Sequence, residues 1–252
     1  MQEPLINEAL QLTTEANRRG IILRIMGALA FRLHCPKYRH LFVYHKRELS
    51  DIDFAAYSRH RHDIEELLRE FGYNIDLRHS FVRGDRIIFI NSKNRIHVDI
   101  FFDKLEMCHT INFDERLTID YPTIPLAELL LEKLQIVRLA EKDVKDVAIL
   151  LLEHNVGECD NETINSAYIA KILSDDWGFY YTATTNLEKI KEFSTTFLSP
   201  EEMSIARCRM DTLLERIDNE PISFKWKVRA RIGTRIKWYQ EVEEEHKITN
   251  EN

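Results

Sequence analysis

The sequence predicts an α+β fold, in which a mixed sheet flanked by helices is followed by a helical C-terminal region. Two patterns predict it. Strand-like and helix-like segments alternate up to about residue 124, and after Pro125 the apolar residues recur at helical spacing. The chain has 252 residues, 44% of them hydrophobic and 31% charged. This is a globular composition, sufficient for one large domain or two modest ones.

Helices and strands alternate in the first part of the chain. Apolar spacing and helix-stopping residues predict helices over 3–20, 28–35 and 62–72, which end at Gly20, before Pro36 and at Gly72. Apolar runs of strand length predict strands over 21–26, 51–57, 73–77, 85–91 and 95–102. Such an order favours a mixed sheet with helices packed on it.

The second part of the chain predicts helices alone. The stretch 126–154 is expected to form two helices, and further helices are expected over 164–176, 185–197, 200–217 and 223–245. We therefore expect two regions, a sheet-containing one at 1–124 and a helical one at 125–252.

Charge and composition exclude several classes of protein. The formal net charge is −7, so the chain lacks the overall basic character of a nucleic-acid binder. Its four cysteines are scattered without a CxxC pair, which argues against a zinc knuckle or a disulfide framework and fits a reducing cytoplasm. No signal peptide and no membrane-length apolar run is present, so we expect a cytoplasmic protein with no membrane contact.

Two aspartates stand in the strand-like run "DIDFAAY", at positions 51 and 53. Because side chains alternate across a strand, Asp51 and Asp53 share one face and the apolar Ile52 and Phe54 take the other. In "RIHVDIFF", Asp99 likewise stands opposite an apolar face. If the two strands are neighbours, three carboxylates converge, repel one another and acquire raised pKa values. A divalent cation such as Mg²⁺ would remove that conflict. The alternative is a set of solvated turn or edge residues.

Upstream, "IILRIMGALAF" predicts a strand, a turn at Gly27 and a helix. Such a turn exposes backbone N–H groups at a helix start, which suits phosphate. A glycine in this place is also consistent with turn geometry alone.

Together, "MGALAF", "LSDIDF" and "HVDIFF" resemble the nucleotidyltransferase superfamily of the DNA polymerase β type. The resemblance implies a nucleotidyltransferase core at 1–124, Mg²⁺ or Mn²⁺ as cofactor and an NTP as substrate. It implies that Asp51 and Asp53 are catalytic metal ligands, that Asp99 completes the site as the ligand of a second metal ion and helps to activate the acceptor hydroxyl, and that Gly27 and Ala28 lie near the phosphates.

The helical stretch 129–151 is similar to the segment that follows the core in stand-alone bacterial and archaeal members, including those of abortive-infection toxin type. There a lysine and a later Lys-Asp-x-x-Asp run recur, matching Lys133, Lys142, Asp143 and Asp146. Two features depart from the family. Ala28 replaces a small polar residue or glycine, and the segment 28–50 between Gly27 and Asp51 is longer than usual.

Several other residues have both a functional and a structural interpretation. Arg47 and Ser50 flank the acidic pair; Arg47 could neutralise triphosphate charge or be a surface residue. Lys133 could reach the nucleotide or extend along an apolar helix face. Asp143 and Asp146 lie three residues apart with lysines between them, which is typical of a solvated helical face.

The run "FKWKVRARIGTRIKWY", 224–239, holds basic residues and aromatics but no acid. It could contact RNA through the helix at 225–237, or it could pack its aromatics on the domain while the basic side chains stay in solvent.

These observations predict a Mg²⁺-dependent enzyme that moves an NMP from an NTP to an acceptor hydroxyl on an RNA end, a protein or a small molecule. Two alternatives remain. One is a catalytically inactive module of the same fold that binds a nucleotide or a partner. The other is a toxin–antitoxin-type interaction protein, for which an exposed apolar patch on the C-terminal helices would be the sign.

Overall fold

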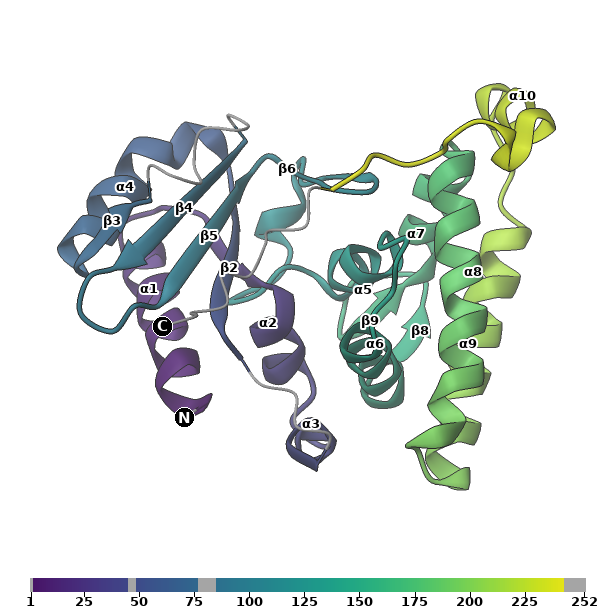
Figure 1. Cartoon of the computed structure of the whole chain (residues 1–252), viewed down its shortest axis with the longest axis horizontal. Helices are drawn as coiled ribbons and strands as arrows, with labels where there is room; N and C mark the ends of the chain where they lie inside the picture. Colours follow the sequence, from purple (N-terminus) through teal and green to yellow (C-terminus); the bar gives the residue numbers. More distant parts are fainter. Residues whose placement is uncertain (1, 45–48, 77–84, 243–252) are drawn as a thin grey trace, which may run out of the picture.

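A five-stranded mixed sheet organises the first half of the chain (Figure 1). The computed structural model describes residues 2–44, 49–76 and 85–242. The strands lie in the order β1 (Leu23–Met26), β2 (Asp51–Ala56), β5 (His97–Phe102), β4 (Arg86–Asn91) and β3 (Tyr73–Ile75). Strands β2 and β5 are parallel, and the other neighbours are antiparallel. This confirms the predicted mixed sheet.

The two faces of the sheet differ in chemistry. On one face, Ile52, Phe54, Val98 and Ile100 are fully buried. Helices α1 (Gln2–Arg18) and α4 (Arg61–Glu70) cover this apolar face (Figure 1). The opposite face carries the aspartates and looks toward α2 (Gly27–His34) and the helical region, and α2 contacts β2, α5 and α6.

Several short elements lie between the longer ones. They are α3 (Arg39–Tyr44), the 3₁₀ turns η1 (Ser58–His60) and η2 (Arg116–Thr118), and the hairpin of β6 (Lys104–Glu106) and β7 (Thr110–Asn112). Of these, the β6–β7 hairpin and η2 connect β5 to the helical region.

The second half is helical apart from one short parallel pair, β8 (Asn155–Gly157) and β9 (Thr163–Asn165). Its helices are α5 (Leu126–Leu134), α6 (Glu141–Glu153), α7 (Ser166–Leu173), α8 (Trp177–Phe193), α9 (Pro200–Asp218) and α10 (Phe224–Ile232), with 3₁₀ turns η3 (Ser194–Thr196) and η4 (Gly233–Arg235). This confirms the predicted helical C-terminal region.

Side-chain caps explain where four of these helices begin. Asn165, Asp176, Ser199 and Ser223 each accept a hydrogen bond from a backbone N–H in the first turn. The cap at Asp176 places the start of α8 at Trp177, earlier than the expected helix at 185–197.

The helix expected over 223–245 was wrong in length, because α10 ends at Ile232. Gly233 follows with φ of 62°, and Arg229 donates hydrogen bonds to the carbonyls of Gly233 and Ile236 beyond the helix. The chain then runs back over α8 as an extended segment, residues 236–242, which we call the C-terminal strap (Figure 1).

The strap connects the helical region to the β6–β7 hairpin. The Trp238 indole N–H donates to Thr182 Oγ1 at 3.0 Å, and the Gln240 N–H donates to the Cys108 carbonyl at 2.9 Å. Gly178 permits this course, because a Cβ there would lie 2.4 Å from the Trp238 carbonyl oxygen.

One buried apolar core extends from the sheet into the helical region, from Leu23 and Phe54 to Leu130, Leu150 and Leu213. The division into two regions between residues 124 and 125 therefore stays a prediction, because the two regions share this core. None of the helices in the described part of the chain combines the length and apolarity that a membrane-crossing helix requires.

Candidate functional site

Asp53 and Asp99 are direct neighbours in the sheet. In the parallel pairing of β2 with β5, Asp53 lies opposite Asp99 and Asp51 lies opposite His97. Side chains at paired positions point to the same side of a sheet, and Asp51 is two residues before Asp53. The three aspartates therefore share one face, the face turned toward α2 and the helical region.

The surroundings of Asp53 disfavour its charged form. Asp99 is 8% exposed, and Asp51 and Asp53 are half-buried. Burial, followed by the charges of Asp51 and Asp99, raises the pKa of Asp53 well above its usual range. The Lys133 ammonium opposes that shift.

Asp99 has a partner that the sequence did not reveal. The Arg86 guanidinium, from the adjacent strand β4, donates a hydrogen bond to Asp99 Oδ2 and forms an ion pair with it. Arg86 pairs with Phe101 in the sheet, so it stands on the aspartate face. The sequence feature that could have indicated this partner is a positive charge at the start of the apolar, strand-like run "RIIFI".

Two predicted residues flank Asp51. The exposed Ser50 hydroxyl donates to Asp51 Oδ1 at 2.9 Å, which orients that carboxylate. Arg47, the predicted neutraliser of triphosphate charge, lies outside the described residues.

The turn between β1 and α2 is built around Gly27. Gly27 has φ of +65°, and a Cβ there would lie 2.1 Å from Asp53 Oδ2. The Asp53 carboxylate therefore occupies the space that any side chain at position 27 would need. Ala28, the next residue of α2, is half-buried and contributes no polar side-chain atom to the turn.

The Gly27 N–H is already used by a residue that sequence reasoning missed. It donates to Glu132 Oε2 of α5 at 3.2 Å. Glu132 is 7% exposed, and burial raises the pKa of its carboxyl group to about 7. A buried carboxylate from the helical region therefore contacts the turn that holds Asp53. In the sequence, Glu132 is hidden inside the apolar run "LLLEKLQI".

Glu132 makes the stability of the protein depend on pH. Its folded pKa is raised from 4.5 to about 7, so the folded state loses stability as pH rises through that range. We expect Glu132→Gln, whose amide oxygen can still accept the Gly27 N–H, to match the wild type in thermal stability near pH 4. At pH 8 the variant should be more stable, by up to about 3 kcal/mol. Thermal melts across this pH range measure the difference, and a constant difference at every pH would contradict the assigned pKa.

Lys133 joins α5 to α6. Its ammonium lies 3.1 Å from Asp143 Oδ1 and 3.7 Å from Asp146 Oδ2, and both aspartates are buried. The expectation of a solvated face for Asp143 and Asp146 was therefore wrong, because a lysine from the preceding helix compensates their charges. Lys133 also lies 5.7 Å from the Phe31 ring of α2.

The donor chemistry of the aspartate face suits Mg²⁺ or Mn²⁺. Within residues 2–44, 49–76 and 85–242, no three histidine, cysteine, aspartate or glutamate side chains converge as a preformed metal cage. Mg²⁺ usually needs only one or two carboxylates, since water and substrate phosphates complete its octahedron. Asp51 and Asp53 fit that requirement. Their carboxylate oxygens are suitable ligands, and a bound cation would relieve the repulsion between their charges.

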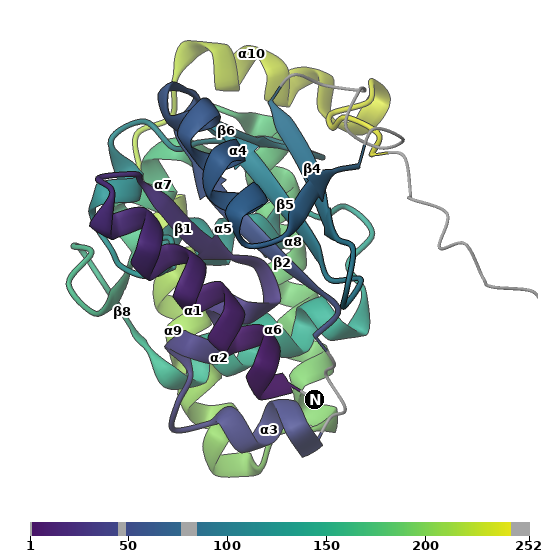
Figure 2. The same cartoon turned by 90° about the vertical axis from the view of Figure 1, so that its left-hand side faces the viewer.

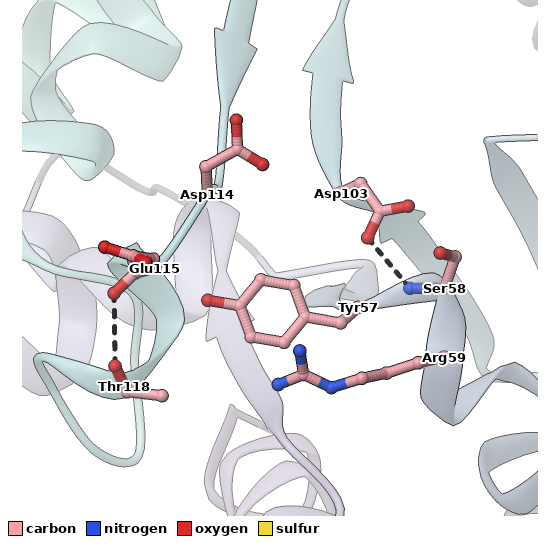
Figure 3. A pocket seen from close by; sticks show the side chains of 7 residues that line it. All are labelled: Tyr57, Ser58, Arg59, Asp103, Asp114, Glu115 and Thr118. Atoms are coloured by element: carbon pink, nitrogen blue, oxygen red, sulfur yellow. Dashed lines mark hydrogen bonds between the residues drawn. The ribbon is translucent and has the colours of Figure 1, made fainter.

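A cavity of about 810 Å³ lies where β2 and β5 end, apart from the aspartate face (Figure 3). Ser58 and Asp103 line one side of the cavity, and Glu115 and Thr118 line the other. The side chains of Tyr57 and Arg59 extend between these two sides. The Ser58 N–H donates to Asp103 Oδ1 at 2.9 Å. Tyr57 is four residues beyond Asp53 along β2, roughly 13 Å away at the usual rise of a strand. No motif in the sequence indicates this cavity.

No family model matches the chain, and neither does any curated protein. Among solved structures, the solution structure of the antibiotic-resistance factor ANT(2'')-Ia is similar to this chain with a TM-score of 0.45 and 11% sequence identity. The similarity covers 69% of this chain and 96% of that one. At this level it adds no support to a function, which has to be argued from the site.

Proposed function

We propose that the protein is a nucleotidyltransferase that uses Mg²⁺ or Mn²⁺ and transfers an NMP from an NTP to an acceptor hydroxyl. The observation that carries the proposal is the pairing of Asp53 with Asp99 on one face of the sheet, with Asp51 beside them and the Gly27 turn pressed against Asp53. A half-buried Asp53 next to the charges of Asp51 and Asp99 has little structural use, because its ionisation destabilises the fold. Their arrangement is suited to binding a cation together with a polyphosphate.

Each residue would have a defined role. Asp51 and Asp53 would hold the divalent cation, which when bound would neutralise charge on the triphosphate. The start of α2, at Gly27 and Ala28, would lie near the phosphates; the Gly27 N–H would be available to them only by leaving Glu132. Arg47 would add positive charge, and Lys133, which is paired with Asp143 and Asp146, would reach the nucleotide only by leaving one of these aspartates.

Asp99 would act on the acceptor. The acceptor hydroxyl oxygen attacks the α-phosphorus and forms the new P–O bond. The bond from the α-phosphorus to the bridging oxygen breaks, and pyrophosphate leaves with the electron pair. The hydroxyl proton passes to the Asp99 carboxylate, which Arg86 holds in place.

The direct test is to incubate the protein with labelled NTPs, Mg²⁺ and, in separate reactions, cellular RNA, protein extract and small polyhydroxy compounds. We expect one acceptor class to acquire label, and EDTA to prevent it. The absence of label in all three, together with unchanged ATP affinity with and without Mg²⁺, would contradict the proposal and favour an inactive binding module.

If the acceptor is RNA, the basic helix α10 should bind it, and this role requires the basic residues to lie on the same side of the protein as Asp51. Helix α10 lies beyond α8, at the end away from the sheet (Figure 1), so RNA bound there would have to extend across the helical region to reach the aspartates. Lys225, Lys227 and Arg231 are exposed on α10. We expect their joint replacement by Ala to weaken RNA binding and to lower the slope of log affinity against log salt by about one per lost phosphate contact. NTP affinity should stay unchanged. Filter-binding titrations at several salt concentrations measure the slope, and an unaltered slope would exclude α10 from the RNA contact.

A second candidate is an interaction protein, because the C-terminal helices do carry exposed apolar residues. Phe224 is 82% exposed and Val228, one turn later on α10, is 44% exposed. Under this candidate, Phe224→Ala would abolish the capture of a protein partner and Asp53→Asn would not. Under the proposed function, Asp53→Asn would abolish transfer instead.

A further inference from the structure

The three tryptophans of the chain line one small cavity between α8 and α10. The cavity measures about 190 Å³, and Trp177, Trp226 and Trp238 surround it together with Asp175, Lys225 and Arg229. This is smaller than the roughly 300–1,000 Å³ of pockets for drug-sized ligands, and suits a single planar ring system. Helix α10 lies at the end of the helical region away from α2 and α3 (Figures 1 and 2).

The rings differ in what they offer to a ligand. Trp177 is buried, with Tyr181 stacked at 5.3 Å and the Arg229 guanidinium 4.9 Å from its centroid. Trp226 meets Tyr180 edge-on, and Trp238 meets Tyr181 edge-on. Both are half-buried, and among the described residues no ring stacks face to face on either. The stacking surface is therefore that of Trp226 and Trp238.

The polar groups of the cavity favour a neutral ring over a cation. Arg229 already fills the cation position on Trp177 and is fixed by the carbonyls of Gly233 and Ile236. Asp175 lies 3.9 Å from the Lys225 ammonium, and Asp176 caps α8. The Trp226 indole N–H is buried and has no acceptor within the described structure. A heterocycle with ring nitrogens or carbonyl oxygens would supply one.

The charge outside the cavity is positive. Lys227, Arg231 and Arg235 are exposed, and in the part of the chain that the structure describes no acidic residue forms an ion pair with them. Basic residues on a helix that also carries aromatic rings are a combination with which proteins bind single-stranded nucleic acid.

We propose that this cavity binds one unstacked base of a single-stranded RNA whose phosphates lie along α10. The base stacks on Trp238 and accepts the Trp226 indole N–H at its own edge, while Lys227, Arg231 and Arg235 contact phosphates of the neighbouring nucleotides. This deepens the proposed function by naming the acceptor class and rests on it for the consequence of binding. Binding itself needs neither NTP nor metal.

Tryptophan fluorescence tests the inference, because each tryptophan of the chain lines the cavity. The full protein is titrated, without NTP or Mg²⁺, with a short single-stranded oligoriboadenylate and with an abasic oligomer of equal length. We expect the RNA to quench the emission and to bind at least about tenfold more tightly than the abasic oligomer. Equal affinity for both would overturn the proposal, because charge alone would then explain binding.

Substitutions distinguish the contribution of the Trp226 ring to RNA binding from that of the rest of α10. Trp226→Ala should weaken RNA binding at least about tenfold, and Trp226→Phe, which keeps a ring but lacks the N–H, should weaken it less. Phe224→Ala, on the same helix outside the cavity lining, is the matched control and should bind as the wild type does. Wild-type affinity in Trp226→Ala would overturn the proposal. If a trimethyllysine peptide quenches the emission and RNA does not, the cavity binds a cation and the proposal is also overturned. Because the titration lacks NTP, a failure here leaves the transfer reaction itself untouched.

Discussion

Replacing Asp53 by Asn is expected to abolish nucleotide transfer and to leave the protein folded. The substitution keeps the size of the side chain, so the close approach to Gly27 is preserved. It removes one of the two carboxylates that would hold the cation, and we expect the transfer rate to fall by about 10²–10³-fold or more. The rate of label transfer from NTP, with Asp63→Asn on the surface of α4 as the matched control, measures the loss.

The same variant has an opposite effect on stability. In the metal-free protein the raised pKa of Asp53 means that its ionisation destabilises the folded state as pH rises above about 4. Asn carries no such charge, so the melting temperature of Asp53→Asn should equal or exceed that of the wild type, and the gap should widen with pH. A large drop in melting temperature would identify Asp53 as a structural residue instead.

Gly27→Ala is expected to destabilise the protein by about 3–5 kcal/mol. The new methyl group would lie 2.1 Å from Asp53 Oδ2 and 3.1 Å from Asp53 Cβ, so the carboxylate must rotate away and the β1–α2 turn must shift from β2. A further part of the destabilisation comes from the backbone, because an alanine adopts a φ of +65° at a cost of about 1–2 kcal/mol. Denaturant unfolding monitored by circular dichroism measures the change.

The chain supplies a matched control for this prediction. Gly20 has φ of +74°, and a Cβ there meets nothing within 4 Å. Gly20→Ala should therefore show the conformational cost alone. Adding Asp53→Ala to Gly27→Ala should recover the clash part of the loss. If Gly27→Ala is no worse than Gly20→Ala, Asp53 does not press on the turn as described.

The shared face of the aspartates was predictable because it follows from a local rule. A period of two places Asp51 and Asp53 on one side of their strand and Asp99 on one side of its own, whatever the rest of the chain does. The sequence does not state that the two strands are adjacent. The register that pairs Asp53 with Asp99 depends on strand order, which is set by packing between distant segments.

The partners of the site were less predictable for the same reason. Nothing near Arg86 or Glu132 in the sequence indicates their partners, since the groups that they bind, Asp99 and the Gly27 N–H, lie on other elements. Asp143 and Asp146 looked solvated because lysines flank them in sequence, whereas the lysine that neutralises them belongs to α5. Charge compensation across helices leaves no local pattern.

Adjacent residues of α5 limit how far the sheet can be treated as a transferable unit. Glu132 reaches the Gly27 turn and Lys133 reaches α6, about 100° away around the same helix. A fragment ending at residue 124 would retain Asp51, Asp53, Asp99 and Gly27 but would lose the acceptor of the Gly27 N–H. In a chimaera that joins this sheet to a different helical region, the replacement would have to bring its own Glu-Lys pair in the same register. Recombination between chains of this architecture should therefore succeed upstream of β1 or downstream of α6, and fail between them.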